Sequence, residues 1–398
     1  MWGSLYCFIG PKLFEYKLTK SQYSIGRNAS NDIVIPDESS FISNFHFTLS
    51  EHDGLARLKS TGKCGTYVNG KKETDLPLST IAEIYIPYKY YFVFVWQDTP
   101  LPLVKEQYYI FRHTILGNGS FATVYLAIDI NTNTHLACKI INTQRFKLST
   151  KKHSTTSTFS HVEDEIKILR KINHPNIVDI KSVSVEHDTH QVLLFLTFIS
   201  GGELFDRIAK EGGIDETESL FFFFQLLLAV QYLHQNNICH RDIKAENVLL
   251  ESTKKFSRIF LTDFGMSKFN VDLMQTKCGT FTYIAPEILD NPNGYSKAVD
   301  CWALGVLLYT RLQGELPFGS DSQPQELVNR IRSANLRFDT EIFLNVSSEA
   351  KDLISKFLEV DPQVRITVDE ALEHPWIAQN RSPLSKLYTK MMSKSLIL

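Results

Sequence analysis

The sequence lacks a long hydrophobic run and lacks an excess of charge of either sign. Its longest apolar stretch, residues 220–230, contains Gln225 and is far shorter than the roughly 18 residues that span a bilayer, so it predicts a buried helix. The 42 basic and 44 acidic residues leave a formal net charge of −2, so no bulk field attracts nucleic acid or an anionic membrane. We therefore expect no direct nucleic-acid partner and no membrane association.

Closely spaced cysteine pairs, a secretion signal and internal repeats are also missing. The six cysteines are scattered without a CxxC pair, which favours reduced thiols in the cytosol or nucleus. The first residues have no basic region ahead of a long apolar stretch, and Pro11 interrupts them, so we expect no signal peptide. At roughly 100 to 200 residues per domain, the 398 residues indicate two or three domains.

What is present divides into two unlike halves. Up to residue 97, short β-type runs such as "LYCFI", "HFTLS" and "YYFVFVW" alternate with Gly, Asn, Asp and Pro, which predicts a β-sandwich or barrel. Residues 98–107 carry two prolines and form a candidate linker. More strands follow, and from about residue 160 helical periodicity dominates, as at Phe224, Leu227 and Leu228. The second half is therefore predicted to be α+β. The polar residues 142–160 fit a disordered insertion or a regulatory site.

The second half contains residue types that hold phosphates. "LGNGSFATVYLA" carries Gly117 and Gly119, which let backbone amides wrap phosphates, although an ordinary hairpin can look the same. "LACKI" places Lys139 among apolar strand residues, where an unpaired ammonium is costly. Glu165, on the predicted helix "HVEDEIKILRKI", is the natural counter-ion. This pairing leaves Lys139 to hold the α and β phosphates of a nucleotide.

Two further motifs, "HRDIKAENVLL" and "LTDFGMSK", follow one another. Asp242 can accept a hydroxyl proton, and Lys244 can neutralise a transferring phosphoryl group. Asn247 and Asp263 offer oxygen ligands for Mg²⁺.

At this point the chain resembles the eukaryotic protein kinases, from about residue 108 to residue 377. The resemblance includes "APE" with Glu287, the "DCWALG" helix around Asp300, Arg365 as the partner of Glu287, and the closing "HPWI". It implies a bilobal α+β fold that uses ATP and Mg²⁺. Because the catalytic lysine, the acidic residues and the metal ligands are all present, we expect an active enzyme and not a pseudokinase. Ala122 stands where a third glycine would fit.

The resemblance also implies the individual site residues, with Leu196 as gatekeeper of the hinge "LLFLTFISGGELF". The implied catalytic residues are Asp242, Lys244, Asn247, Lys139 and Glu165, and the implied metal ligands are Asn247 and Asp263. The implied ATP-binding residues are Leu116, Gly117, Asn118, Gly119, Val124, Ala137, Lys139, Leu196, Thr197, Phe198, Ile199, Glu203 and Asp263. Glu203 and Glu246 match acidic positions that bind arginine in basophilic kinases. Protein substrates with Arg three residues before the target Ser or Thr are therefore expected, unless Glu203 touches only ribose and Glu246 is solvated.

Residues 266–287, "MSKFNVDLMQTKCGTFTYIAPE", match a kinase activation segment. Arg241 precedes the catalytic Asp242, and a phosphothreonine can neutralise it and order the segment. Thr276 is the better candidate for this phosphate. Thr280 is the other candidate, although its unmodified hydroxyl often braces the catalytic loop in relatives. Phe281 replaces the usual proline and leaves the preference for the next substrate residue open.

The first half resembles the forkhead-associated (FHA) domain, a sandwich that binds phosphothreonine peptides. The motifs are "SIGRN", "FISNFHF" and "GTYVNG", and an arginine offers a rigid fork to a phosphate. The implied phosphopeptide-binding residues are Arg27, Ser43, Asn44, His46 and Asn69. Phe45 replaces a usual basic residue and Cys64 a usual asparagine, with Lys63 as a compensating charge. A purely structural sandwich is the alternative.

Together the halves resemble the checkpoint kinase 2 family and its fungal meiotic relatives. We divide the chain into an FHA domain (1–97), a linker (98–107), a kinase domain (108–377) and a tail (378–398). Many kinases of this family begin with a cluster of Ser-Gln and Thr-Gln sites. In this sequence the only such sites are at Ser21, Thr143 and Ser322, far apart, so we expect the phosphothreonine to come from an adaptor protein. The resemblance implies a nuclear kinase of a DNA-damage or meiotic checkpoint. Its activation in trans through a transient homodimer is our hypothesis, based on the effective concentration that phosphate capture would create.

Two rival functions remain open. One is a binding scaffold whose kinase half merely holds nucleotide. The other is a calcium/calmodulin-regulated kinase, because the tail spaces Leu384, Leu387 and Met391 helically among lysines. The same tail pattern also fits a helix that is solvated or packed on the kinase lobe.

Overall fold

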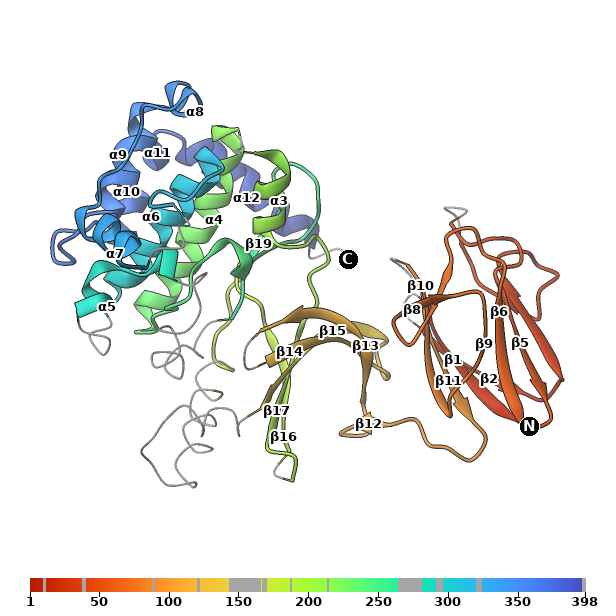
Figure 1. Cartoon of the computed structure of the whole chain (residues 1–398). Helices are drawn as coiled ribbons and strands as arrows, with labels where there is room; N and C mark the ends of the chain where they lie inside the picture. Colours follow the sequence, from red (N-terminus) through yellow and green to blue (C-terminus); the bar gives the residue numbers. More distant parts are fainter. Residues whose placement is uncertain are drawn as a thin grey trace. The chain divides into compact units, whose positions relative to one another are not determined.

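The structure is a computed structural model (Figure 1). It describes residues 1–9, 12–37, 41–87, 90–119, 122–142, 166, 170–186, 188–212, 215–263, 281–290, 296–319 and 324–395. The chain divides into two compact units: the first comprises Met1–Thr143 and Lys181–Phe198, and the second comprises Gln144–Ile180 and Ile199–Leu398.

The N-terminal part of the first unit is a β-sandwich, as the alternating runs predicted. One sheet has the strand order β2-β1-β11-β10-β7-β8 and the other has the order β4-β3-β5-β6-β9. The side chains between the sheets, such as Leu5, Phe47, Leu58 and Phe92, are fully buried, because successive strand residues point to opposite faces. The strands are β1 (Gly3–Ile9), β2 (Lys12–Leu18), β3 (Gln22–Gly26), β4 (Ile33–Val34), β5 (Phe47–His52), β6 (Leu55–Ser60), β7 (Thr66–Val68), β8 (Lys71–Glu73), β9 (Asp75–Pro77), β10 (Ile81–Ile86) and β11 (Tyr90–Trp96).

A third, antiparallel sheet completes the first unit, in the order β12-β13-β14-β15-β17-β16. Its strands are β12 (Leu103–Val104), β13 (Tyr108–Asn118), β14 (Ala122–Asp129), β15 (Thr134–Asn142), β16 (Ile180–Glu186) and β17 (Gln191–Thr197). The segment that we interpreted as a linker contributes β12, which pairs with Tyr108 and Tyr109 of β13. Two strands, β16 and β17, also lie beyond residue 160, where we expected helical periodicity to dominate. This sheet carries the glycine-rich stretch and Lys139.

The second unit is mainly helical around α4, which is buried on nearly all sides. The predicted buried helix at residues 220–230 is confirmed within α4. No helix among the described residues has the length and apolar character needed to cross a membrane. The helices and strands are α3 (Leu204–Glu211), α4 (Glu216–Gln235), η1 (Ala245–Asn247), β18 (Val248–Leu250), β19 (Ile259–Leu261), η4 (Phe281–Tyr283), α5 (Pro286–Asp290), α6 (Ala298–Gln313), α7 (Pro324–Ser333), α8 (Glu341–Leu344), α9 (Ser348–Phe357), α10 (Val368–Glu373), α11 (Pro375–Ala378) and α12 (Arg381–Ser395).

A buried ion pair joins α5 to the loop before α10, and it confirms the predicted pairing of Arg365 with Glu287. The guanidinium donates to the two Glu287 oxygens at 2.7 and 2.9 Å, and it also donates to the carbonyl oxygens of Ala298 and Glu359. Its side chain is fully buried, and it lies 5.0 Å from the Trp302 ring centroid. Arginine suits this site because its fork matches a carboxylate in two places.

Replacing Glu287 with alanine tests the importance of this pair. We expect Glu287→Ala to lower the free energy of unfolding by about 3–5 kcal/mol, because it leaves the Arg365 charge buried and uncompensated. The matched control is Glu373→Ala, which breaks the exposed pair with Arg381 and is expected to cost at most about 1 kcal/mol. Denaturant unfolding of the full chain measures both values. Equal small losses would contradict the dependence of the second unit on the buried pair.

Candidate functional site

The motif "HRDIKAEN" forms a loop ahead of β18 in which Asp242 is held from two sides. The Lys244 ammonium donates to both Asp242 carboxylate oxygens at 3.0 Å. The Asn247 amide nitrogen donates to the Asp242 carbonyl at 2.7 Å and to carboxylate Oδ2 at 2.9 Å. The structure therefore brings three of the predicted catalytic residues together and fixes the orientation of the carboxylate.

The loop is anchored by Asp300, which lies in the first turn of the apolar helix α6. Asp300 accepts the backbone N–H groups of His240 at 2.8 Å and Arg241 at 2.7 Å, and its Oδ2 also lies 2.8 Å from His234 Nε2. Arg241 has a φ of 68°, in the left-handed region that a non-glycine residue rarely adopts. The sequence showed Asp300 only as part of a motif, and its anchoring role comes from the structure. The available signal was a carboxylate in an otherwise apolar helix.

His240 joins the loop to the strand that leads to Asp263. Its Nε2 lies 3.0 Å from the Thr262 carbonyl, to which it donates, and its Nδ1 accepts the Asp242 N–H. Burial lowers the pKa of His240, which favours the neutral ring that this pair of bonds requires. The Thr262 N–H in turn donates to the Asn247 carbonyl at 2.9 Å. Asp263 follows directly with a φ of 63°, so it too is held in an uncommon backbone conformation.

Asn247 and Asp263 fit the oxygen chemistry of a magnesium site. The side-chain amide nitrogen of Asn247 donates to Asp242, so the side-chain oxygen Oδ1 is left as the ligand atom. Magnesium in kinases is held by one or two such side chains together with substrate phosphates. The described residues contain no cluster of three or more His, Cys, Asp and Glu side chains suited to a metal.

An acidic group lies beside the catalytic loop in the second unit. Burial raises the pKa of Glu203, and the negative charges of Asp206, Glu246 and Asp263 raise it further, in that order. Glu246, on η1, has a buried carboxylate oxygen, Oε2, without a hydrogen-bond partner in the described structure. A buried oxygen of this kind is costly unless a donor reaches it. The group is therefore suited to an arginine side chain from outside.

One face of the third sheet carries four of the predicted nucleotide-binding residues of the first unit. Val124 lies opposite Lys139, and Ala137 lies opposite Leu196, so these four side chains share a face. Val124, Ala137 and Leu196 are only half-buried, whereas Cys138 on the other face is fully buried. Lys139 is 9% exposed. The sheet thus leaves a partly open apolar face that also carries a buried lysine, which suits a purine and its phosphates.

The two glycines of the phosphate-binding stretch are not required by local packing. Among the residues that the structure describes, a Cβ at Gly117 would meet only Val124, at 4.0 Å, and a Cβ at Gly119 would meet the Ala122 carbonyl at 3.4 Å. Packing within the described part of the chain therefore leaves room for side chains here. Glycine at both positions is better explained by a close approach of something external to the backbone.

The predicted kinase-site residues are thus distributed over both units. The first unit holds Leu116, Gly117, Asn118, Gly119, Val124, Ala137, Lys139, Leu196, Thr197 and Phe198, and the second holds Ile199, Glu203, Asp242, Lys244, Asn247 and Asp263. Glu165, Thr276 and Thr280 lie outside the described residues, as does nearly all of the polar segment 142–160.

A second candidate site lies on the loops around Arg27. The Arg27 N–H donates to the Ser43 carbonyl at 3.2 Å, and the Ser43 hydroxyl accepts the Lys63 N–H at 3.0 Å. Arg27 is exposed and makes no ion pair within the described part of the chain. Gly26 allows these loops to meet, because a Cβ there would lie 2.3 Å from the Asn44 carbonyl oxygen. The Arg27 backbone thus lies beside the bonded Ser43 and Lys63, and its exposed guanidinium is of the type that pairs with a phosphate.

His46 braces this arrangement from inside. Its Nδ1 accepts the Ser43 N–H at 3.1 Å, and its Nε2 donates to the Gly65 carbonyl at 3.3 Å. Burial lowers its pKa, so the ring is neutral and keeps one donor and one acceptor. Gly62 packs against the ring, where a Cβ would lie 2.2 Å from Nε2.

Asn69 and the two residues that depart from the FHA pattern, Phe45 and Cys64, each have a different environment. Asn69 accepts the Glu83 N–H at 2.9 Å and donates to the Ser79 hydroxyl, so these side-chain bonds run to β10 and to the residues just before it. Phe45 is 51% exposed beside Asn44. The Cys64 thiol lies 3.4 Å from the Phe41 carbonyl and 3.9 Å from His46 Nε2, and burial raises its pKa. Cys64 is therefore turned toward the protein.

Comparison with known protein families gives two matches. The protein kinase domain model matches residues 111–377, and the FHA domain model matches residues 23–86. The chain is 40% identical to myosin light chain kinase A of Dictyostelium discoideum over 280 residues, which are 70% of this chain and 90% of that protein. It is 38% identical to the meiosis-specific serine/threonine-protein kinase mek1 of Schizosaccharomyces pombe over 296 residues, covering 71% of this chain and 62% of that protein.

Two further relatives extend the comparison. The probable serine/threonine-protein kinase fhkC of Dictyostelium discoideum is 37% identical over 290 residues, which are 72% of this chain and 47% of that protein. The chain thus spans less than two thirds of mek1 and of fhkC. The crystal structure of Rad53 residues 1–466 with AMP-PNP is similar with a TM-score of 0.59 at 30% identity, covering 95% of this chain and all of that one. The chain therefore belongs to the protein kinase family and carries an FHA domain ahead of its kinase domain.

Proposed function

We propose that this protein is an ATP- and Mg²⁺-dependent serine/threonine kinase of a DNA-damage or meiotic recombination checkpoint, recruited through its FHA domain to a phosphothreonine-bearing adaptor. One observation carries the proposal: an exposed Arg27 in a braced phosphate-type site precedes an ordered Asp242–Lys244–Asn247 loop in a single chain. The likeness to mek1 and Rad53 supports the checkpoint assignment. Action on checkpoint targets makes the nucleus the proposed location.

In this proposal Asp242 positions the substrate hydroxyl and accepts its proton. The bonds from Lys244 and Asn247 hold the carboxylate, and Lys244 also neutralises charge on the transferring phosphoryl group. Lys139, on the same sheet face as Val124, binds the nucleotide phosphates. Magnesium would neutralise the nucleotide phosphates when held by Asn247 and Asp263. The apolar side chains Val124 and Leu196 exclude water from the base.

The FHA domain supplies the proposed recruitment step. A phosphate pairs with the Arg27 guanidinium and accepts a bond from the Ser43 hydroxyl, whose oxygen already accepts the Lys63 N–H. Capture on an adaptor raises the local concentration of a substrate or of a second kinase molecule to the order of mM. Phosphorylation of Thr276 or Thr280 in trans, through a transient homodimer, then follows. Asn69 contributes by supporting the domain through its bonds to Glu83 and Ser79.

The acidic group supports a preference for substrates with Arg three residues before the target. The carboxylates of Glu203, Asp206 and Glu246 create a negative potential that an arginine side chain would relieve. A guanidinium can also supply the donor that Glu246 Oε2 lacks among the described residues.

The structure gives a reason against the calcium/calmodulin alternative. Leu384 on α12 is 5% exposed, and Leu387 and Met391 pack against the same core. Tyr388 donates to Asn176 at 2.7 Å and stacks edge-on against Phe224 of α4. The apolar face that calmodulin would bind already packs on the kinase lobe, so the helix would have to leave it first.

Catalysis is tested by Asp242→Asn in the full chain. We expect autophosphorylation and peptide phosphorylation to fall by about 10²- to 10⁴-fold, because the proton acceptor is lost. Asp339→Asn, at an aspartate that is 71% exposed, is the control and should keep the parental rate. Radiolabelled ATP measures both reactions. A parental enzyme without transfer activity on any substrate, while it still binds ATP, would favour the nucleotide-binding scaffold instead.

Phosphothreonine recognition is tested by Arg27→Ala. We expect binding of a phosphothreonine peptide library to weaken by about 10- to 100-fold, since a hydrogen bond to a charged group contributes roughly 1.5–3 kcal/mol and 1.4 kcal/mol is tenfold. Arg57→Ala removes an exposed arginine of β6 and should leave binding unchanged. Fluorescence anisotropy with phosphorylated and unphosphorylated peptides gives the affinities. Equal binding by Arg27→Ala and the parent would show that the sandwich is purely structural.

The substrate preference is tested by Glu246→Gln. The parent should phosphorylate a peptide with Arg at the third position before the target more efficiently than its Ala counterpart, and Glu246→Gln should reduce this ratio of kcat/KM about tenfold or more. Glu251→Gln, at a largely exposed glutamate that lies 3.9 Å from Arg258, is the control. If the ratio stays at the parental value in Glu246→Gln, Glu246 does not recognise the substrate arginine.

A further inference from the structure

Strand β13, which leads into the glycine-rich stretch, is irregular in its middle. Phe111 pairs with Leu126, but the next pair toward the glycines is Ile115 with Tyr125, so residues 112–114 face no regular partner on β14. On the other side, β12 reaches only Tyr108 and Tyr109. A bulge of this kind frees backbone N–H groups that must find acceptors elsewhere.

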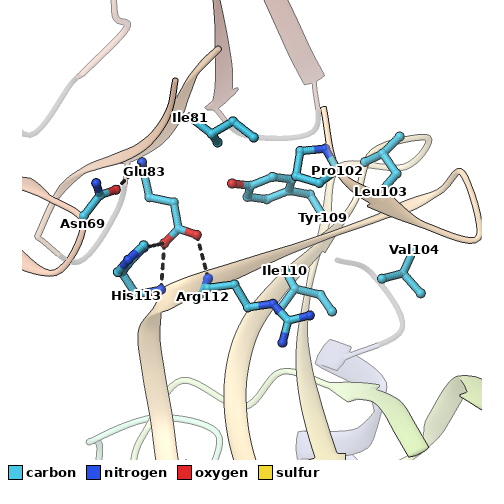
Figure 2. Close-up of a pocket in the computed structure, with 10 residues that line it drawn as sticks. All are labelled: Asn69, Ile81, Glu83, Pro102, Leu103, Val104, Tyr109, Ile110, Arg112 and His113. Carbon is cyan, nitrogen blue, oxygen red and sulfur yellow. Dashed lines mark hydrogen bonds and ion pairs between the residues drawn. The ribbon is translucent and has the colours of Figure 1, made fainter. Parts of the chain in front are cut away.

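Glu83 of the FHA domain supplies these acceptors. Its Oε1 accepts the Arg112 N–H at 2.6 Å, and its Oε2 accepts the His113 N–H at 2.9 Å (Figure 2). The His113 ring nitrogen Nδ1 also lies 3.2 Å from Oε2. The Glu83 side chain is 6% exposed, so both bonds are shielded from water. The Glu83 carboxylate thus accepts the two N–H groups that have no strand partner on β14.

Glu83 is itself held firmly on β10. Asn69 donates its N–H to the Glu83 carbonyl at 2.8 Å and accepts the Glu83 N–H with its side-chain oxygen. Asn69 and Gly70 have φ values of 49° and 82°, which turn the chain toward β13. A Cβ at Gly70 would lie 3.2 Å from the His113 carbonyl oxygen, so this turn approaches the bulge closely. The "GTYVNG" motif therefore supports a contact with the kinase sheet.

Apolar side chains close the same contact. Phe8, Val93 and Val95 of the FHA sheet form one buried cluster with residues of the kinase sheet that include Phe111 and Leu126. Phe8 lies edge-on to Phe111, with ring centroids 5.5 Å apart. Such packing favours a defined docking over a loose tether.

A cavity of about 340 Å³ lies beside the carboxylate, lined by Glu83, His113, Tyr109 and the residues of β12 (Figure 2). Burial raises the pKa of Glu83, while the bonds from His113 and Arg112 and the His113 charge oppose this rise. Burial also raises the pKa of Tyr109, and the neighbouring Glu83 raises it further. Tyr109, Arg112 and His113 all approach Glu83 from β13, so the Glu83 carboxylate is the shared acceptor of this contact.

We propose that Glu83 is a positioning residue for the nucleotide site: the FHA domain docks on the kinase sheet of its own chain and fixes the β13 bulge that sets the path of Leu116 to Gly119. The partner of this FHA surface is thus the kinase domain itself, recognised through two backbone N–H groups and an aromatic cluster. The inference rests on the proposed ATP-binding role of Leu116–Gly119.

The test compares Glu83→Gln with the parent in the full chain. Glutamine keeps one acceptor oxygen but points an NH₂ group at the second N–H, so hydrogen exchange of a peptide covering residues 108–116 should rise at least tenfold. Affinity for an ATP analogue should fall about three- to tenfold, while phosphothreonine-peptide affinity stays parental. Asp75→Asn, which alters an exposed ion pair of the same domain, is the matched control.

Glu83→Asp is the second variant, because it keeps the charge but shortens the reach, and it should give an intermediate effect. Hydrogen exchange in α4 shows whether Glu83→Gln folds. If it does not fold, Glu83→Asp provides the test of the docking contact. Control-like exchange in both variants would overturn the docking contact. Increased exchange with unchanged nucleotide affinity would overturn the positioning role. A parent that binds no ATP analogue would instead refute the proposed function on which the inference rests.

Discussion

The kinase half depends on one buried carboxylate, because Asp300 accepts two successive backbone N–H groups of the catalytic loop. A buried N–H without a partner costs about 1–3 kcal/mol, and Arg241 adds the strain of its left-handed backbone. Asp300 offsets both costs from helix α6, whose other side chains are almost all buried. Asp242 is therefore positioned by the core of the second unit, so its geometry is as rigid as the packing of that core.

The same physical solution recurs where the chain leaves regular structure. Glu216 at the start of α4 accepts the Ser347 N–H and the Trp376 indole N–H, and it thereby ties α9 and α11 to the central helix. Glu83 accepts two N–H groups of the β13 bulge. In each case a carboxylate that lies far away in sequence satisfies donors that no strand or helix partner can reach. Charged hydrogen bonds of this kind are stronger than neutral ones, which suits them to holding irregular segments.

Patterns and motifs predicted much of this structure, where the periodicity is local or where a family motif supplies a distant contact. The alternating runs of the sandwich, the buried α4 and the pairing of Glu287 with Arg365 follow from spacing or from motif resemblance. Glu83 does not. In "IAEIYI", Ala82, Ile84 and Ile86 face the sandwich core, so alternation places Glu83 on the outer face, where a glutamate is normally solvated. Only a neighbouring sheet buries it, and a contact of that kind leaves no periodic signal in the sequence.

The two candidate functions of the FHA domain use different surfaces. Arg27 and His46 belong to the ends of β3 and β5 in one sheet, whereas Glu83 and Phe8 lie on β10 and β1 of the other. A peptide bound at the Arg27 loops therefore leaves the Glu83 contact intact. The proposed recruitment then requires no release of the kinase sheet, and a docked FHA domain removes the flexibility that would dilute its effective concentration. By this reasoning, the proposed phosphothreonine partner would be captured by a kinase whose nucleotide strand is already in place.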